Sequence, residues 1–295
     1  MRPPEIPPCA TRELNVSDVF TYLPRQGSRL ISRALLRGIW TYRGFIAGSV
    51  KREFQSKYRN TMLGATWAVL SPLAMILVYT LIFSQVMHSR LPGIASPYAY
   101  SIYLCAGVLT WGLFAEITSR GQVMFIENGN LLKKLSFPRI CLPIIVVANA
   151  LVNFAVVFAL FIAFLLVTGQ FAGVPVVAMV PVLLLQVLLA IGLALVLGIL
   201  NVFFRDVGQF FNVAIQFWFW LTPVVYPFSI IPEPMRPWMA WNPMVPVIQS
   251  YQRIFVEGLW PRWETLAWPL FVALLLCILG LKLFRKRSSE MVDEL

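Results

Sequence analysis

The chain has 295 residues, of which 59% are hydrophobic and only 13% are charged. About a quarter of the residues of a soluble domain are charged, so this composition excludes an ordinary soluble fold and indicates a polytopic membrane protein. The formal net charge of +11 would suggest nucleic-acid binding in a soluble protein, but most of the cations flank apolar segments. Membrane topology and anionic lipid headgroups explain them better, so we expect no nucleic-acid partner.

Several kinds of site are excluded by the residues that the sequence lacks. It has no GxxxxGK[ST] motif and therefore no phosphate-binding loop of its own for ATP. The single histidine, His88, has no ligand companions at useful spacing, and the four cysteines form no CxxC pair. We therefore expect no metal, no cofactor and no catalytic residue in this chain.

Two segments precede the first long apolar run. Residues 1–32 are polar and rich in proline, which predicts a flexible cytoplasmic tail. Residues 33–60 predict an amphipathic interface helix, because apolar residues recur at steps of three and four between cations. Such a helix can lie on the membrane surface or pack on a soluble partner, and periodicity does not separate the two. The recurring apolar residues are Leu35, Ile39, Tyr42, Ile46, Val50, Phe54 and Tyr58.

Six apolar segments then predict an all-α membrane domain over residues 61–287, followed by a cytoplasmic tail at 288–295. The predicted spans are about 64–86, 97–119, 140–167, 174–204, 207–228 and 265–281. With the N-terminus inside, 20 of the 24 Lys and Arg residues fall on the cytoplasmic side, and only Arg90, Arg236, Arg253 and Arg262 lie outside. The positive-inside rule therefore predicts that both termini are cytoplasmic.

The stretch 229–263 does not fit a plain loop. Six prolines divide it into short runs that carry many large apolar residues, each run being too short to span a bilayer. This pattern predicts short re-entrant helices in the outer interface before the last span. Irregular backbone at that depth requires protein or a watery cavity beside it, which points to a pore or a substrate exit on the outer side.

Ionisable groups are almost absent from the predicted spans. Glu116 is the exception, and it fits a structural ion pair as well as a functional group. The polar residues Asn149, Asn153, Gln186 and Gln216 are best explained by hydrogen bonds between helices. A proton- or sodium-coupled carrier needs more charge at depth, so the energy for any transport must come from elsewhere.

Aromatic residues are frequent in the spans, where they can pack against helices and lipid or form a path for sugars. Aromatic faces stack on pyranose rings without demanding one sequence of sugars, which suits a long polymer. The candidates for such a path are Trp67, Tyr79, Phe83, Trp111, Phe114, Trp218 and Trp220.

Seven short motifs appear in a characteristic order. They are KREFQSKYR at 51–59, LGATW at 63–67, LSP at 70–72, NLLKKLSFPR at 130–139, FFRD at 203–206, LTPVVYP at 221–227 and WNPM at 241–244. Each is weak alone, but together they resemble the ABC-2 type permeases that export polysaccharides, and O-antigen permeases most of all. The resemblance covers residues 35–287.

The resemblance implies a homodimer that works with two copies of a separate ATPase subunit, which would bind ATP and Mg²⁺. It places the chain in the bacterial cytoplasmic (inner) membrane. The exported substrate would be a glycan linked to undecaprenyl diphosphate. The alternatives are an exporter of drugs or small lipids, or a membrane glycosyltransferase.

The resemblance also implies three groups of site residues. A coupling helix that contacts the ATPase would include Glu127, Asn128, Leu131, Leu132, Lys133 and Lys134. The entry for the lipid diphosphate would include Lys51, Arg52, Lys57 and Arg59, which plain topology explains equally well. The outer gate would include Tyr226, Trp238, Trp241 and Tyr251.

Overall fold

The computed structural model describes residues 43–59, 64–82, 96–134, 139, 141–287 and 290–294, and all regular structure in these residues is helical. The chain divides into two units, Met1–Phe45 and Ile46–Leu295. Of the first unit only residues 43–45 are described, and they begin helix α3 (Arg43–Tyr58). The predicted tail at 1–32 and the first part of the predicted interface helix lie outside the described residues.

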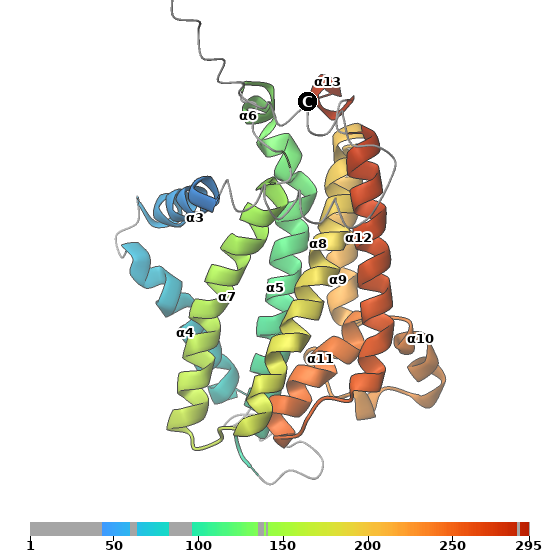
Figure 1. Cartoon of the computed structure of the whole chain (residues 1–295). Coiled ribbons are helices and arrows are strands. Elements are labelled where there is room, and N and C mark those ends of the chain that lie inside the picture. Colours follow the sequence, from blue (N-terminus) through green and yellow to red (C-terminus); the bar gives the residue numbers. More distant parts are fainter. Residues whose placement is uncertain are drawn as a thin grey trace, which may run out of the picture. The chain divides into compact units, whose positions relative to one another are not determined.

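Four long apolar segments form the body of the second unit. They are α5 (Ala99–Glu127), α7 (Cys141–Val167), Val174–Phe203, which ends in α8 (Met179–Phe203), and Trp263–Arg287, which contains α12 (Ala267–Arg287). Of these helices α5, α8 and α12 run in one direction and α7 runs in the opposite direction (Figure 1). Each is long and apolar enough to cross a bilayer, so the chain is a multi-pass membrane protein.

The other two predicted spans form shorter helices. α4 (Trp67–Tyr79) belongs to an apolar helical segment, Trp67–Ile82, which follows a single helical turn at Gly64–Thr66. Residues 83–86 of that predicted span lie outside the described residues. α9 (Asp206–Trp220) has 15 residues and ends well before the predicted position 228. Pro223 and Pro227 explain the early end, because proline lacks the N–H that a helix interior requires.

Small residues let α8 approach α5 and α12 closely. A Cβ atom added to Gly198 would lie 2.6 Å from the carbonyl oxygen of Gly121 on α5. One added to Gly192 would lie 2.9 Å from the backbone nitrogen of Cys277 on α12. Close backbone contact of this kind is a main source of helix association in membranes, where no hydrophobic effect drives it.

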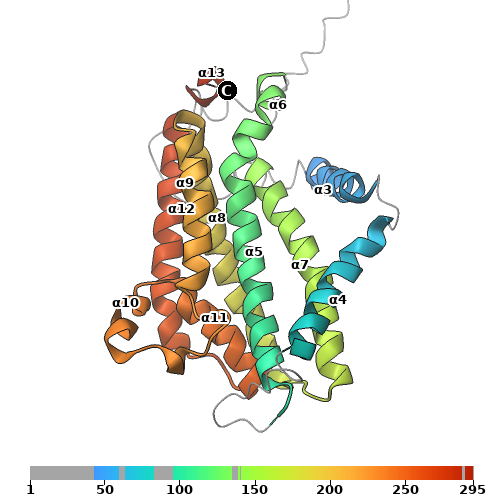
Figure 2. The ribbon, with the colours of Figure 1, turned by 180° about the vertical axis from the view of Figure 1, so that it is seen from behind.

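The ends of the bundle carry short helices. α6 (Gly129–Lys134) and α13 (Glu290–Glu294) lie at one end and contact each other. At the opposite end the predicted re-entrant stretch forms α10 (Arg236–Ala240), α11 (Met244–Gln252) and single helical turns at Phe228–Ile230, Glu233–Met235 and Arg253–Glu257 (Figures 1 and 2). α11 packs against α5 and α8, so its backbone is covered by protein.

Candidate functional site

A charged cluster joins three helices at the end of the bundle that carries α6. Glu53 on α3 forms an ion pair with Arg120 on α5 and accepts a hydrogen bond from the side-chain amide of Asn149 on α7. Arg120 also lies 3.5 Å from a carboxylate oxygen of Glu116, one turn earlier on its own helix. Asn153 on α7 donates to that same oxygen at 2.6 Å.

In this cluster Glu116 forms an ion pair between side chains of one helix. The cluster also contains residues that the sequence analysis did not single out. Arg120 is counted in the sequence analysis only as one of the cytoplasmic cations, and Glu53 appears there only within the KREFQSKYR motif. The signal was present as two i, i+4 pairs, Glu116 with Arg120 and Asn149 with Asn153, each on one face of an otherwise apolar helix. Spacing alone did not show that both pairs face the same carboxylate on α3.

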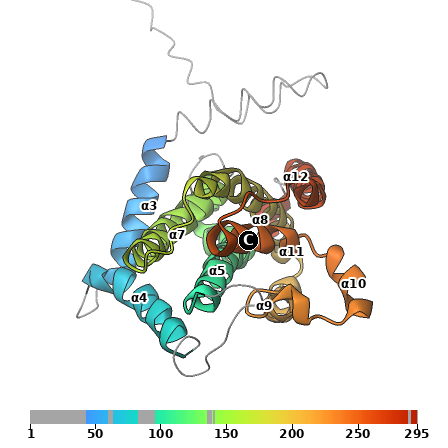
Figure 3. The same cartoon turned by 90° about the horizontal axis from the view of Figure 1, so that it is seen from below.

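The predicted entry cations lie on either side of Glu53 in the sequence. Lys51, Arg52 and Arg59 are exposed, and the Arg52 guanidinium donates to Ser49 Oγ at 3.0 Å. Lys57 is part of α3, and its side chain lies outside the described residues. Figure 3 shows α3 beside α7, as the bond between Glu53 and Asn149 requires.

The predicted coupling segment forms the end of α5 and the short helix α6. Leu132 is buried with Met124, Phe125, Leu142 and Met291, so this leucine anchors α6 to the bundle. Glu127 and Lys133 are exposed, while the Asn128 side chain donates back to the Met124 carbonyl oxygen at 2.8 Å. The side chains of Leu131 and Lys134 lie outside the described residues. Among the described side chains of this segment, those of Glu127 and Lys133 can therefore be reached by a partner, whereas that of Leu132 cannot.

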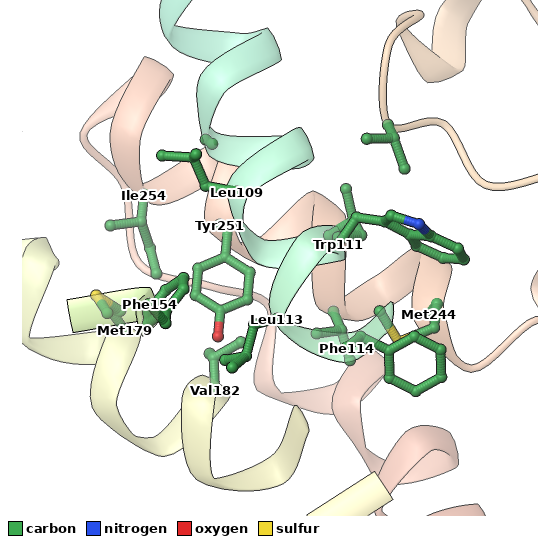
Figure 4. Packing of buried hydrophobic residues seen from close by; sticks show 14 of the residues in the cluster. Leu109, Trp111, Leu113, Phe114, Phe154, Met179, Val182, Met244, Tyr251 and Ile254 are labelled. Carbon is green, nitrogen blue, oxygen red and sulfur yellow. The ribbon is translucent and has the colours of Figure 1, made fainter. Parts of the chain in front are cut away.

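Three of the predicted path aromatics pack on one another inside the bundle. The rings of Phe114 and Trp218 lie 5.2 Å apart, and those of Trp111 and Phe114 lie 5.6 Å apart, all in tilted or edge-on contact. Trp111 and Phe114 are buried (Figure 4), so their faces are covered by protein in this conformation.

The remaining path aromatics differ in exposure. Trp67 and Trp220 are exposed, and Tyr79 is half-buried. Phe83 lies outside the described residues. Trp67 and Trp220 are therefore the predicted path residues with the most accessible rings.

The predicted gate residues also divide by exposure. Trp238 and Trp241 are exposed, and Trp241 packs edge-on against Trp268 with ring centroids 5.5 Å apart. Tyr226 donates its hydroxyl to the Trp220 carbonyl oxygen at 2.6 Å, and partial burial raises the pKa of this phenol above its ordinary value. Tyr251 is completely buried among Leu109, Leu113 and Val182 (Figure 4).

Side chains hold the irregular segment 221–227 that follows α9. Tyr103 on α5 donates to the carbonyl oxygens of Pro223 and Tyr226, and Tyr100 donates to that of Val225. These carbonyl groups have no helix of their own to bond with, and the tyrosines replace the missing partners. The arrangement joins the end of α9 to the start of α5.

α9 carries polar residues along one edge. Gln209, Asn212 and Gln216 follow at steps of three and four and are all exposed, whereas Gly208 and Phe211 are buried. The Asn212 side chain accepts a hydrogen bond from Gln122 on α5 at 2.7 Å, which fixes this edge beside α5 (Figure 2). Exposed amides are unfavourable against lipid tails, so this edge suits a water-filled space.

No group of three or more His, Cys, Asp or Glu side chains in the described part of the chain could hold a metal ion. The described geometry offers ion pairs, amides and aromatic faces, which are groups for binding and for positioning helices.

Comparison with known proteins agrees with this picture. Residues 46–256 match the ABC-2 type transporter family. The chain is 33% identical over 263 residues to the O-antigen export system permease protein RfbA of Myxococcus xanthus, covering 88% of this chain and 99% of that protein. It is 29% identical over 243 residues to RfbA of Klebsiella pneumoniae, covering 82% and 91%. It is 23% identical over 246 residues to the polysialic acid transport protein KpsM of Escherichia coli, covering 82% and 92%.

Proposed function

Because this chain belongs to the ABC-2 type transporter family, we propose that it is the permease subunit of an ATP-driven exporter for a lipid-linked polysaccharide similar to O-antigen. One observation carries the proposal: relatives named for two different exported glycans, O-antigen and polysialic acid, each align with more than four fifths of the chain. A drug or small-lipid exporter would not be expected to have both as relatives.

The exposed polar edge of α9 supports a path for a glycan. A sugar polymer needs hydrogen-bonding groups and water along its way, and Gln209, Asn212 and Gln216 supply amides at regular steps. We propose that this edge faces a conduit between two copies of the chain. Trp220 at the end of α9 would then present an aromatic face at one mouth of the conduit.

ATP is hydrolysed by a separate partner in this proposal. The sequence has no phosphate-binding loop, and permeases of this family are not themselves catalytic. Two copies of an ATPase, each with ATP and Mg²⁺, would dock at the end of the bundle that carries α6. The exposed Glu127 and Lys133 are the groups that we assign to this contact.

The proposed topology has six spans in the bacterial cytoplasmic membrane, with α4 and α9 as the two shorter ones and both termini in the cytoplasm. Residues 33–60 would form the interface helix, and 228–257 would form the outer gate. Cations support this orientation: Lys282, Arg285, Lys286 and Arg287 end α12 at the end of the bundle that carries α6. At the entry, Lys51, Arg52, Lys57 and Arg59 would attract the undecaprenyl diphosphate headgroup to the inner leaflet.

Deleting the gene for this chain in its host and measuring total and surface polymer tests the proposal. We expect surface polymer to be lost and lipid-linked polymer to accumulate inside, with export restored by the full-length chain. Normal surface polymer would contradict the proposal. Loss of all polymer would favour a glycosyltransferase, and altered dye efflux with normal polymer would favour a drug exporter.

A matched pair of variants tests the assigned ATPase contact. Lys133→Glu on α6 and Lys282→Glu on α12 both reverse an exposed charge at the same end of the bundle. We expect Lys133→Glu alone to lower export and ATPase stimulation in membranes. Equal effects of both variants would assign the loss to general electrostatics at the membrane surface.

A further inference from the structure

Among the described residues Arg120 forms ion pairs with two carboxylates, Glu53 and Glu116, and Glu127, further along α5, adds a weaker electrostatic interaction. Glu53 and Glu116 share the Arg120 guanidinium, and each carboxylate is also held by an asparagine of α7. The guanidinium can hydrogen-bond both carboxylates, but its single positive charge cannot balance two negative charges, so one carboxylate is in surplus. Losing that carboxylate would leave Arg120 paired with the other one.

Glu53 is the carboxylate that can leave. Glu116 lies one turn from Arg120 on the same helix, so its distance from the cation is set by α5 itself. Glu53 belongs to a different helix, and 40% of its side chain is exposed, against 28% for Glu116. Its departure requires no change within α5.

Arg120 can be reached from outside the bundle. Its side chain is 34% exposed, although the residues around it on α5, Ile117, Thr118 and Gly121, are buried. An arginine fork binds a phosphate through two parallel hydrogen bonds, and this geometry is stronger and more specific than a single carboxylate contact. A phosphate group can therefore compete with Glu53 for this site.

We propose that Arg120 binds the diphosphate headgroup of the lipid carrier and that Glu53 is its resting counter-ion, displaced when the headgroup arrives. The inference rests on the proposed function and adds to it a specific binding residue. Asn149 would lose its bond to Glu53 in the same step, so that the bond from α3 to α7 opens together with the bond to α5.

Binding of undecaprenyl diphosphate to the full-length chain in phosphatidylcholine nanodiscs tests this proposal. Arg120→Gln should weaken binding about tenfold or more, because a charge-assisted fork is lost. Glu53→Gln should strengthen binding several-fold, because it removes the competitor while its side-chain oxygen can still accept from Asn149. Arg120→Lys should give an intermediate affinity, since the charge stays and the fork is lost.

The opposite signs of the two effects separate a binding role from a structural one. If the ion pair only stabilised the fold, both variants would weaken binding or leave it unchanged, and either result for Glu53→Gln would overturn the proposal. The pair Glu233 and Arg236, which lie 3.8 Å apart at the other end of the bundle, provides the matched control. Glu233→Gln and Arg236→Gln should leave the affinity unchanged.

Other sources of phosphate are distinguished by competition. Inorganic pyrophosphate and phosphatidylglycerol are added separately to the wild-type chain, and we expect neither to displace the lipid at comparable concentration. Equal competition by phosphatidylglycerol would overturn the assignment to a diphosphate headgroup. The surface-polymer assay is independent: if export depends on this chain but Glu53→Gln does not strengthen binding, only the Arg120 inference fails.

Discussion

The side-chain amide of Gln252 donates to the carbonyl oxygen of Pro223 at 3.1 Å and lies 3.4 Å from that of Val224. Gln252 is buried at the end of α11, and both carbonyl groups belong to the irregular segment after α9. One side chain therefore joins the predicted gate to the end of a helix that we assign to the conduit. α5 also packs closely against this segment: a Cβ added to Gly107 would lie 2.6 Å from the Val224 carbonyl oxygen.

Replacing Gln252 by Leu should destabilise the chain by about 1–3 kcal/mol, the usual penalty for leaving a buried carbonyl without a donor. Pro223 retains its bond from Tyr103 at 3.2 Å, so the loss falls mainly on Val224. Thermal unfolding of the purified chain in nanodiscs measures the effect. Gln209→Leu, on the exposed edge of α9, is the control and should leave the unfolding temperature unchanged. Equal stability of the two variants would mean that the bond from Gln252 is not needed to hold the segment.

Replacing Gly198 by Val should prevent close packing of α8 on α5. The added side chain would meet the Gly121 carbonyl oxygen at 2.6 Å and side-chain atoms of Met124 and Phe125 at 3.3 Å, and the backbone oxygen has little room to adjust. We expect a loss of about 1–3 kcal/mol or more, typical of overpacking, and reduced accumulation of the chain in membranes. Gly112→Ala is the matched control, because a Cβ at that position on α5 meets nothing within 4 Å. A Gly198→Val chain that accumulates normally would contradict the close contact.

Two substitutions of Tyr251 distinguish a packing role of this residue from a gating role. Its hydroxyl is buried without a hydrogen-bond partner among the described residues, whereas its ring fills the core. Tyr251→Phe should therefore be neutral or slightly stabilising, since it removes a buried hydroxyl group that makes no hydrogen bond to the described residues. Tyr251→Ala should cost about 3–5 kcal/mol through the cavity it leaves. Both are measured by thermal unfolding, and a loss of export in Tyr251→Phe with unchanged stability would support the gate instead.

The sequence predicted the long helices well because the membrane imposes a simple rule on them. A run of apolar residues at 140–167 or 174–204 has few alternatives to a helix, and Cys141–Val167 and Val174–Phe203 match these runs within a residue. The end of α9 was harder to predict. Residues 221–228 are apolar enough to continue a span, although Pro223 and Pro227 are a signal against a continuous helix. Only the structure shows that tyrosines and Gln252 of other helices bond to the freed carbonyl groups.

The site residues were predictable as types but not as contacts. Trp111, Phe114 and Tyr251 are aromatic in the right segments, yet a helix has buried and exposed faces that composition does not distinguish. The ion pair of Glu53 with Arg120 joins residues 67 positions apart in the sequence. The residues next to Glu53 and Arg120 in the sequence do not indicate that the two form a pair, because the pairing depends on where α3 lies beside α5 and α7.

The polar edge of α9 makes a prediction about export itself. Gln216→Leu should lower the rate of glycan export while leaving insertion and stability intact, because an exposed amide contributes nothing to the core. A lost hydrogen bond to a sugar hydroxyl is worth about 1 kcal/mol, or about fivefold in rate if it is made in the limiting step. Initial appearance of surface polymer after induction measures that rate.

The control for Gln216 lies on the same helix. Val213 is also exposed on α9 but is apolar, so Val213→Leu changes size without removing a hydrogen-bonding group. If the polar edge faces the conduit, Gln216→Leu slows export and Val213→Leu does not. If α9 instead faces lipid along its whole exposed surface, Gln216→Leu removes an unfavourable amide from hydrocarbon. The variant chain would then be more stable and would export at the wild-type rate, and the conduit would have to lie against another helix.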